Sequence, residues 1–368
     1  MRSGAGTTAY IGSHKRHAMM RQVSTTIPPA AAVLEAFGID PDSLEPSLSG
    51  LINQTWLARG SGQRALVLQR LNPIFSAQVN RDIDVVTQHL LGKGIAAPAL
   101  IRTLDGALWF EQAGEVWRAL TRVEGVCHEA AEHSARVREA ARVLGEFHRG
   151  VDDLEHDFEN VRLGVHDTAK HLRALQDVLE QFEGHPEYAT VAPLARDIRA
   201  LGAELPPLPK ARDRIVHGDP KIANVLFKAG KDQAICLIDF DTLGRMPIAL
   251  ELGDALRSWC NPASEEAANA TFSMELFRAA IEGYADITRG WLEPAEWQAI
   301  PGGTLTIAVE LAARFCADAL RESYFGWNPN RFATASLHNQ ARARGQLAIA
   351  RTLRAELPEM QRLVAATF

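Results

Sequence analysis

The spacing of apolar residues along the chain changes near residue 123. From about residue 47 to residue 123, apolar and polar positions alternate over short stretches that are separated by turn residues such as Asp-Gly and Ala-Gly, which is typical of an antiparallel sheet. Within this part, "RDIDVVTQHLLGKG" has helical spacing and ends at a glycine. We therefore predict a small sheet lobe with one inserted helix, preceded by a short helix over 29–38.

The remainder of the chain is mainly helical in pattern. Residues 129–202 and 251–368 carry helical periodicity, as in "AARVLGEFHRGV" and "NQARARGQLAIARTLRAEL". Between them, after the Pro-rich "LPPLP", lies a compact strand-rich insert that reads "RIVHGD", "NVLFKAG" and "AICLIDFD". These patterns predict an α+β protein with a loose tail over 1–26, an N-terminal lobe over 27–123 and a C-terminal lobe over 124–368.

Composition narrows the classes of protein that fit this pattern. The chain has 368 residues, of which 46% are hydrophobic and 23% charged, and its net charge of −6 offers no basic field for nucleic acid. No apolar run approaches the length of a membrane-spanning helix. The four cysteines show no CxxC or Cys/His metal spacing, which suits a reducing compartment. We predict a cytoplasmic protein without nucleic-acid or membrane partners.

Chemically active residue types gather in "RIVHGDPKIANVLF", residues 214–227. Asp219 follows an apolar run, with Lys221 two residues on and Asn224 five residues on, and Asp239 follows the next strand pair. A turn at "KAGKD" would bring Asp239 beside the others. One carboxylate and one amide suit Mg²⁺, which takes few protein oxygens, so Asn224 and Asp239 are the predicted metal ligands. Asp219 would orient a hydroxyl and accept its proton, and Lys221 would lie at the transferring phosphate.

This order of residues is the order of a kinase catalytic loop: an Asp, an Asn five residues on, and a metal-binding Asp after the next strand. An isolated His-Gly-Asp is often a plain turn, and His217 is predicted to be a structural hydrogen-bonding residue. The full set, H-G-D-x-K-x-x-N followed by I-D-F-D, is specific. The sequence therefore predicts ATP-dependent phosphoryl transfer with a Mg²⁺ cofactor.

The chain also resembles a known family. "HGDPKIANVLF" and "LIDFDT" resemble the aminoglycoside phosphotransferase superfamily, whose members share a protein-kinase-like bilobal fold. "SGLINQTWLA", "LVLQRLN", "ELGDALRS" and "RFCADALRESYF" are similar to the N-acetylhexosamine 1-kinases and their relatives, and together these stretches extend from about residue 49 to residue 325. The resemblance implies a nucleotide-binding N-terminal lobe and a larger, mainly helical lobe that carries catalysis and substrate binding.

The resemblance implies roles for individual residues as well. The turn "SGLINQT" would cover the nucleotide phosphates, and residues 121–123 would form a hinge that pairs with adenine through its backbone. The nucleotide-binding residues would be Gly50, Asn53, Thr55, Gln69, Arg70, Thr121 and Val123. The acceptor would contact Asp219, Asp241, Arg314 and Tyr324.

Three positions depart from the pattern either of the protein kinases or of the hexosamine kinases. Gln69, with Arg70 beside it, stands where protein kinases have a strand lysine, so the cation at the phosphates is left open, as is its helix partner, Asp82 or Asp84. The sequence "ELGD" appears where the hexosamine kinases have Asp-Phe-Gly-Asp. Leu51 stands where they have a histidine near the sugar. A leucine cannot hydrogen-bond a hydroxyl, and such a change shifts specificity.

Three hypotheses about function remain open. The leading one is a kinase that acts on a hydroxyl of a hexose or hexosamine, including the anomeric hydroxyl, with a specificity different from the N-acetylglucosamine and N-acetylgalactosamine kinases. The second is a kinase of the same fold for an aminoglycoside, homoserine, choline or a similar alcohol. An amine would need an acidic or aromatic cage, for which Asp254, Trp259 and Glu265 are candidates. The third is a nucleotide-binding pseudokinase, which the missing strand lysine favours.

Overall fold

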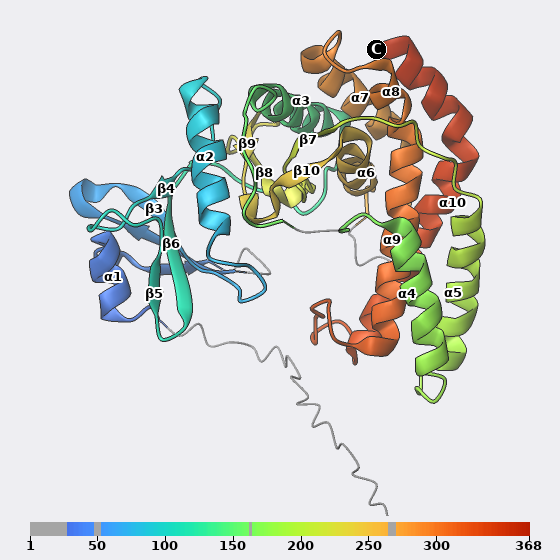
Figure 1. Ribbon diagram of the computed structural model, residues 1–368, viewed down its shortest axis with the longest axis horizontal. Helices are drawn as coiled ribbons and strands as arrows, with labels where there is room; N and C mark the ends of the chain where they lie inside the picture. The colour runs from blue at the N-terminus through green and yellow to red at the C-terminus, as the bar shows by residue number, and fades with distance from the viewer. Residues whose placement is uncertain (1–27, 48–52, 162–163, 264–269) are drawn as a thin grey trace, which may run out of the picture.

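The computed structural model describes residues 28–47, 53–161, 164–263 and 270–368. Figure 1 shows a smaller part that contains the main sheet, a larger helical part, and helix α2 between them. This confirms the predicted α+β fold with an N-terminal antiparallel-sheet lobe and a larger helical lobe. Gly50, Leu51 and most of the turn "SGLINQT" lie outside the described residues, as does the predicted tail.

The N-terminal sheet is antiparallel throughout. Its strands run in the order β1-β2-β3-β6-β4, and β5 also pairs with β6. The strands are β1 (Glu45–Ser47), β2 (Gln54–Arg59), β3 (Ala65–Arg70), β4 (Leu100–Ile101), β5 (Phe110–Gln112) and β6 (Glu115–Thr121). The predicted strands in "PALIRT" and "ALWFEQ" are correct in place but shorter, with two and three residues.

Alternation along the strands gives this sheet two different faces. One face carries Trp56, Leu68 and Trp117, which pack with helix α1 (Ala31–Phe37) in a small apolar core. The opposite face carries polar side chains, Thr55 on β2, Gln69 on β3 and Arg118 on β6, in matching register. The lobe therefore presents a polar sheet face toward α2 (Val79–Gly92) and the rest of the chain.

The two helices of this lobe follow their sequence patterns. Gly38 ends α1 in the left-handed conformation, with φ of 61°. Helix α2 buries the predicted apolar stripe of Ile83, Val86 and Leu90, and it ends two residues before the predicted glycine at Gly94.

The larger lobe is built from eight helices among the described residues. They are α3 (Ser134–Gly150), α4 (Thr168–Gln181), α5 (Tyr188–Ala203), α6 (Ile248–Trp259), α7 (Met274–Thr288), α8 (Pro294–Gln298), α9 (Ile300–Arg321) and α10 (Ala335–Thr367). Helix α9 is buried along nearly its whole length. A Cβ on Gly303 would lie 2.2 Å from the carbonyl oxygen of Ala249, so glycine is what lets α6 and α9 approach so closely. Within the described ranges, the helices are all too short or too polar to cross a membrane.

Four short strands complete this lobe and hold the predicted catalytic segment. They are β7 (Asp213–Val216), β8 (Val225–Phe227), β9 (Ala234–Leu237) and β10 (Gly244–Pro247). As predicted, β8 and β9 form a hairpin. Strand β7 pairs with β10, which the sequence pattern missed because "GRMP" is short and ends in proline. Short 3₁₀ turns link these elements and the N-terminal strands: η1 (Pro41–Ser43), η2 (Ser61–Gln63), η3 (Ile222–Asn224) and η4 (Phe240–Thr242).

Candidate active site

The loop between β7 and β8 brings three predicted residues together. Lys221 Nζ lies 2.5 Å from Asp219 Oδ2. Asn224 Nδ2 donates to the backbone carbonyl of Asp219 at 2.8 Å and to its Oδ2 at 3.1 Å. The Asp219 side chain remains 24% exposed, so its carboxylate is held in place and still accessible to a ligand.

Buried hydrogen bonds hold this loop from behind. Glu251, in the first turn of α6, accepts from the backbone N–H of His217 at 2.8 Å and of Gly218 at 3.1 Å. His217 is fully buried, its Nε2 lies 2.9 Å from the carbonyl oxygen of Ile238, and burial lowers the pKa of its imidazole. His217 therefore acts as a structural residue, as predicted. Glu251 belongs to "ELGD", which departs from the hexosamine-kinase pattern, and the sequence alone does not indicate its supporting role.

Gly218 is required by the backbone of the loop. Its φ is +84°, and a Cβ there would lie 2.1 Å from the carbonyl oxygen of Thr242. Gly230, in the β8–β9 turn, has a φ of +67°, but a Cβ added there would meet no atom within 4 Å. A substitution at Gly230 would therefore introduce only the strain of a left-handed backbone, whereas a substitution at Gly218 would introduce that strain and a steric clash.

We expect Gly218→Ala to destabilise the fold more than Gly230→Ala. The left-handed conformation alone costs an L-residue about 1–2 kcal/mol. Overpacking against Thr242 adds about 1–3 kcal/mol at Gly218. Urea unfolding of both variants measures the difference, and equal losses would show that the loop relaxes freely around the added methyl group.

Asp239 lies two residues beyond the end of β9, on the segment that follows this hairpin. The backbone carbonyl of Asn224 accepts from the N–H of Ile238 at 2.9 Å, which places the backbone of Asn224 beside the residue that precedes Asp239. Burial raises the pKa of the Asp239 carboxyl to about 7, and the charges of Asp241 and Asp219 contribute to the same shift. Such crowding of negative charge favours a bound cation.

The residues at this position fit a magnesium ion. Asn224 directs its Nδ2 toward Asp219, so its Oδ1 is the atom of this side chain that can face a cation. Across the described ranges, no three His, Cys, Asp or Glu side chains converge on a metal position. That is compatible with Mg²⁺, which takes one or two carboxylates and completes its shell with water and phosphate oxygens.

Asp241 has different partners from those that the resemblance implies. It is 1% exposed, and Arg118 Nη2 donates to its Oδ2 at 2.9 Å while Arg118 Nη1 donates to its Oδ1. Asn53 Nδ2 donates to Oδ2 at 2.6 Å. A contact between Asp241 and an acceptor stays a prediction, and the carboxylate would have to share its oxygens to make it. Asn53, predicted at the nucleotide, reaches Asp241 in this structure.

Gln69 and Arg70, which stand where protein kinases have the strand lysine, point to opposite faces of the sheet. Gln69 lies on the polar face, where its Nε2 donates to Thr55 Oγ1 at 3.3 Å and its Oε1 accepts from Arg118 Nε at 2.9 Å. Arg70 lies on the other face and forms an ion pair with Glu115. Gln69 is thus the residue of this pair on the polar face, and the cation beside it is Arg118, which the sequence pattern did not indicate.

Both candidate acids of α2 bind elsewhere. Asp82 is buried and accepts from His156 Nε2 at 2.8 Å and from the backbone N–H groups of Glu159 and Asn160 at 3.0 and 2.9 Å. Asp84 pairs with Arg102 at 2.9 Å. In this structure, neither acid bonds to the side chain at position 69 or 70. Asp82 anchors the segment after α3 to the N-terminal lobe instead.

The predicted hinge lies at the end of β6. The backbone N–H of Thr121 donates to the carbonyl of Ala99 at 2.8 Å, and its Oγ1 accepts from the N–H of Ala99 at 2.9 Å. These bonds use the N–H of Thr121, so a backbone contact with adenine would fall to the residues just beyond the strand, where Val123 is half-buried. The adenine contact stays a prediction.

Arg314 and Tyr324 are neighbours near the C-terminal end of α9. The Arg314 guanidinium lies 5.8 Å from the centre of the Tyr324 ring, and Tyr324 is 66% exposed. Arg314 is also 3.9 Å from Glu310, which is 1% exposed. Glu310 accepts from His166 Nδ1 at 2.9 Å and from Thr168 Oγ1 at 2.7 Å. These side chains form a polar cluster that joins α9 to the start of α4.

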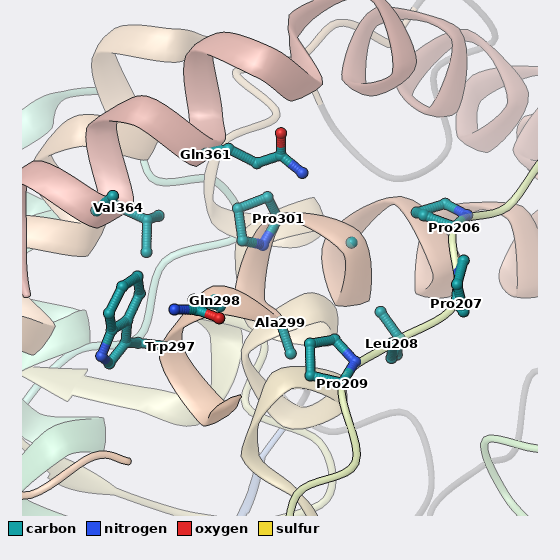
Figure 2. A pocket seen from close by; sticks show the side chains of 12 residues that line it. Pro206, Pro207, Leu208, Pro209, Trp297, Gln298, Ala299, Pro301, Gln361 and Val364 are labelled. Carbon is teal, nitrogen blue, oxygen red and sulfur yellow. The ribbon is translucent and has the colours of Figure 1, made fainter. Parts of the chain in front are cut away.

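An apolar cavity of about 410 Å³ lies in another part of the large lobe (Figure 2). It is lined by the Pro-rich segment 206–209, by Trp297 and Pro301 near the junction of α8 and α9, and by Gln361 and Val364 on α10. None of the predicted site residues lines it. The candidate active site is therefore defined by its polar side chains and not by this cavity.

Comparison with known proteins identifies the family. A model of the phosphotransferase enzyme family matches residues 43–293, which is more than half of the chain and includes Asp219, Asn224 and Asp239. The chain belongs to the phosphotransferase enzyme family. It is therefore a phosphotransferase of the small-molecule kinase type, as the catalytic-loop pattern predicted. The narrower similarity to sugar kinases is not part of this result.

Several solved structures share the fold at low sequence identity. An amicoumacin kinase in complex with AMP-PNP and Ca²⁺ is 15% identical, with a TM-score of 0.61, over 86% of this chain and 91% of that one. An aminoglycoside phosphotransferase from Alicyclobacillus acidocaldarius is 16% identical, with a TM-score of 0.60, over 90% and 97%. A microcompartment-associated aminopropanol kinase is 15% identical, with a TM-score of 0.60, over 89% and 97%.

Proposed function

We propose that this phosphotransferase uses ATP and Mg²⁺ to phosphorylate a hydroxyl group of a small molecule. The observation that carries the proposal is the accessible Asp219 carboxylate, fixed by Lys221 and Asn224 beside the half-buried Asp239. Phosphoryl transfer asks the protein mainly for positioning and for charge stabilisation, and this arrangement offers both. The solved complex of amicoumacin kinase with an ATP analogue and Ca²⁺ is consistent with it.

Each side chain has a defined task in this proposal. Asp219 orients the acceptor hydroxyl and takes its proton as the oxygen attacks the γ-phosphorus of ATP, while the bond from that phosphorus to the β-phosphate oxygen breaks and ADP leaves. Lys221, 2.5 Å from Asp219 Oδ2, supplies positive charge next to the transferred group. Asn224 and Asp239 would hold Mg²⁺. When bound there, the ion would offset the negative charge of the β- and γ-phosphates. The intact set of four residues argues against a pseudokinase.

We further propose that the acceptor is a hexose or hexosamine. Arg314 and Tyr324 offer a donor and an aromatic ring, and the neighbouring Glu310, His166 and Thr168 offer further hydrogen-bonding groups. A pyranose presents hydroxyls at its edge and an apolar face that a tyrosine ring can cover. We expect specificity to differ from that of N-acetylhexosamine kinases, because Leu51 stands where those enzymes have a histidine.

The charge pattern of this region favours a neutral acceptor over an amine. Asp254 is paired with Arg257 at 2.8 Å, so its negative charge is already offset. Glu310 faces His166. Burial lowers the pKa of the His166 imidazole, but the hydrogen bond to Glu310 and the charge of that carboxylate outweigh burial, so the pKa lies above its ordinary value. Trp259, a candidate wall of an amine cage, is fully buried, and Glu265 lies outside the described residues. An ammonium group would need an acid without such a partner.

Arg314→Ala is expected to raise the KM for the acceptor and leave the KM for ATP unchanged. Loss of one charged hydrogen bond to a ligand weakens the affinity for that ligand roughly 10- to 100-fold. Steady-state kinetics with each substrate varied in turn measures both constants. Arg351→Ala is the control, because Arg351 also links two helices, through Asp197 at 2.7 Å, and lies in no predicted site. A loss of thermal stability alone in Arg314→Ala would show that Arg314 only connects the C-terminal helices.

An ADP-release assay over sugars, aminoglycosides and amino alcohols tests the acceptor. With Mg²⁺ and ATP, we expect release to rise above the acceptor-free rate with a hexose or hexosamine. Stimulation by amino alcohols or aminoglycosides and by no sugar would support the alternative kinase. ATP binding without release for any acceptor in the panel would support the pseudokinase hypothesis.

A further inference from the structure

A buried arginine of the N-terminal sheet lies next to the position of the strand lysine of protein kinases. Gln69 occupies that position on β3, and Arg118 on the neighbouring strand β6 is its cross-strand partner. Paired residues on neighbouring strands project from the same face of a sheet. The bond of 2.9 Å from Arg118 Nε to Gln69 Oε1 confirms the shared face, and Asn80 of α2 lies 3.4 Å from Arg118 Nη1. The guanidinium is therefore located between the sheet and α2.

The acid that accompanies this arginine comes from the loop after β9. In protein kinases the strand lysine pairs with a glutamate of the helix that packs on the sheet. In this chain, α2 contributes the amide Asn80, and the carboxylate comes from Asp241, two residues beyond Asp239. The side chains of Arg118 and Asp241 are 2% and 1% exposed. The ion pair thus joins the small lobe to the segment that carries the proposed metal ligand.

We propose that Arg118 binds the phosphates of the nucleotide, in place of the strand lysine, with Asp241 as its anchoring carboxylate. The inference rests on the proposed ATP-dependent function. A guanidinium has five N–H donors. Three of them bond to Gln69 and Asp241, and one faces Asn80, which leaves one hydrogen of Nη2 without a protein partner among the described residues. Phosphate oxygens are strong acceptors for such a donor.

The ion pair with Asp241 brings Arg118 to the segment that carries the proposed metal ligand, because Asp241 lies two residues beyond Asp239. In kinases the metal ions neutralise charge on the β- and γ-phosphates, so a cation beside this segment is also close to the expected place of those phosphates. The other basic side chain at the missing lysine, Arg70, is bound to Glu115 on the opposite face.

The test compares the binding of Mg·ATP with the binding of adenosine, which lacks phosphates. The variants are Arg118→Lys, which keeps the charge, and the double variant Arg118→Gln with Asp241→Asn. Removing one partner of a buried ion pair leaves an uncompensated charge and destabilises the fold, so both charges are removed together. Arg102→Met is the matched control, because Arg102 lies in the same lobe and pairs with Asp84 on its surface. Calorimetry gives the dissociation constants, and thermal melting checks the fold.

We expect the double variant to bind Mg·ATP about 10- to 100-fold more weakly and adenosine as the wild type does. Arg118→Lys should recover part of the ATP affinity, and Arg102→Met should change neither ligand. Wild-type affinity for ATP in the folded double variant would overturn the inference and leave the proposed function intact. Equal losses for ATP and adenosine would overturn it as well, since the pair would then only hold the lobes together. A wild type that binds neither ligand would refute the proposed function itself.

Discussion

Asp219→Asn is expected to lower kcat by about 10²- to 10⁴-fold, the usual contribution of a general base. Asparagine has the same size and keeps one oxygen that can accept from Lys221 and Asn224, so the loop should retain its conformation. The acceptor hydroxyl, however, loses the group that takes its proton. Steady-state kinetics gives kcat, and calorimetry should show that the affinity for Mg·ATP is preserved.

A control substitution distinguishes the loss of the catalytic base from the general effect of removing a negative charge. Asp197→Asn removes a carboxylate from an exposed ion pair with Arg351 and should leave kcat unchanged. If Asp219→Asn keeps a near-wild-type kcat with the physiological acceptor, Asp219 is not the base. If it loses nucleotide affinity together with kcat, its role is to hold the loop and not to accept a proton.

Asp239→Asn is expected to weaken Mg²⁺-dependent ATP binding by at least about 100-fold. Changes that only orient a metal ligand cost 10- to 100-fold in metal affinity, and a direct ligand should cost at least as much. Asparagine is preferable to alanine in this test, because Asp239 has a φ of 69° and asparagine tolerates the left-handed conformation. Isothermal titration with Mg·ATP measures the loss.

Two further measurements complete the test of the metal position. Asn224→Ala should weaken Mg·ATP binding by a smaller factor, about tenfold, because it removes a neutral ligand and a loop bond. Adenosine should bind both variants as it binds the wild type, since it carries no phosphates. Unchanged binding of Mg·ATP to Asp239→Asn would remove Asp239 from the proposed metal position.

Local patterns were sufficient to predict much of the fold. The period of apolar residues gave α1, α2 and the helical lobe, since the stripe of Ile83, Val86 and Leu90 is the face that α2 buries. The hairpin of β8 and β9 followed from two apolar runs around one turn. Strand β10 escaped prediction because its pairing with β7 is set by tertiary contacts, not by any pattern in "GRMP".

The candidate site could be predicted where its residues follow one another closely in sequence. Asp219, Lys221 and Asn224 share one loop, so their spacing alone implies proximity. Arg118 could not be found this way, because it meets Asp241 across 123 positions of the sequence. A signal was present nevertheless: an arginine in an otherwise apolar stretch of a predicted strand needs a partner when it is buried.

Tertiary contacts explain why the partners of the two acids of α2 could not be predicted from the sequence. Asp82 and Asp84 are two residues apart on one helix, and both could have met a cation on the sheet. The structure assigns Asp82 to the segment with His156 and Asn160, and Asp84 to Arg102. A sequence motif predicts which type of residue lies at a given place in the fold. The partner of that residue depends on side chains elsewhere in the sequence, which the motif does not include.

The most direct test of the central claim follows the γ-phosphate of ATP by ³¹P nuclear magnetic resonance, with Mg²⁺ and the acceptor that gives the highest ADP release. The proposed function predicts that the γ-phosphate signal is lost as a new phosphate-ester signal of the acceptor appears in equal amount, and that Asp219→Asn shows neither change on the same timescale. Conversion of ATP to ADP and inorganic phosphate alone, or an unchanged ATP spectrum with every acceptor, would contradict it.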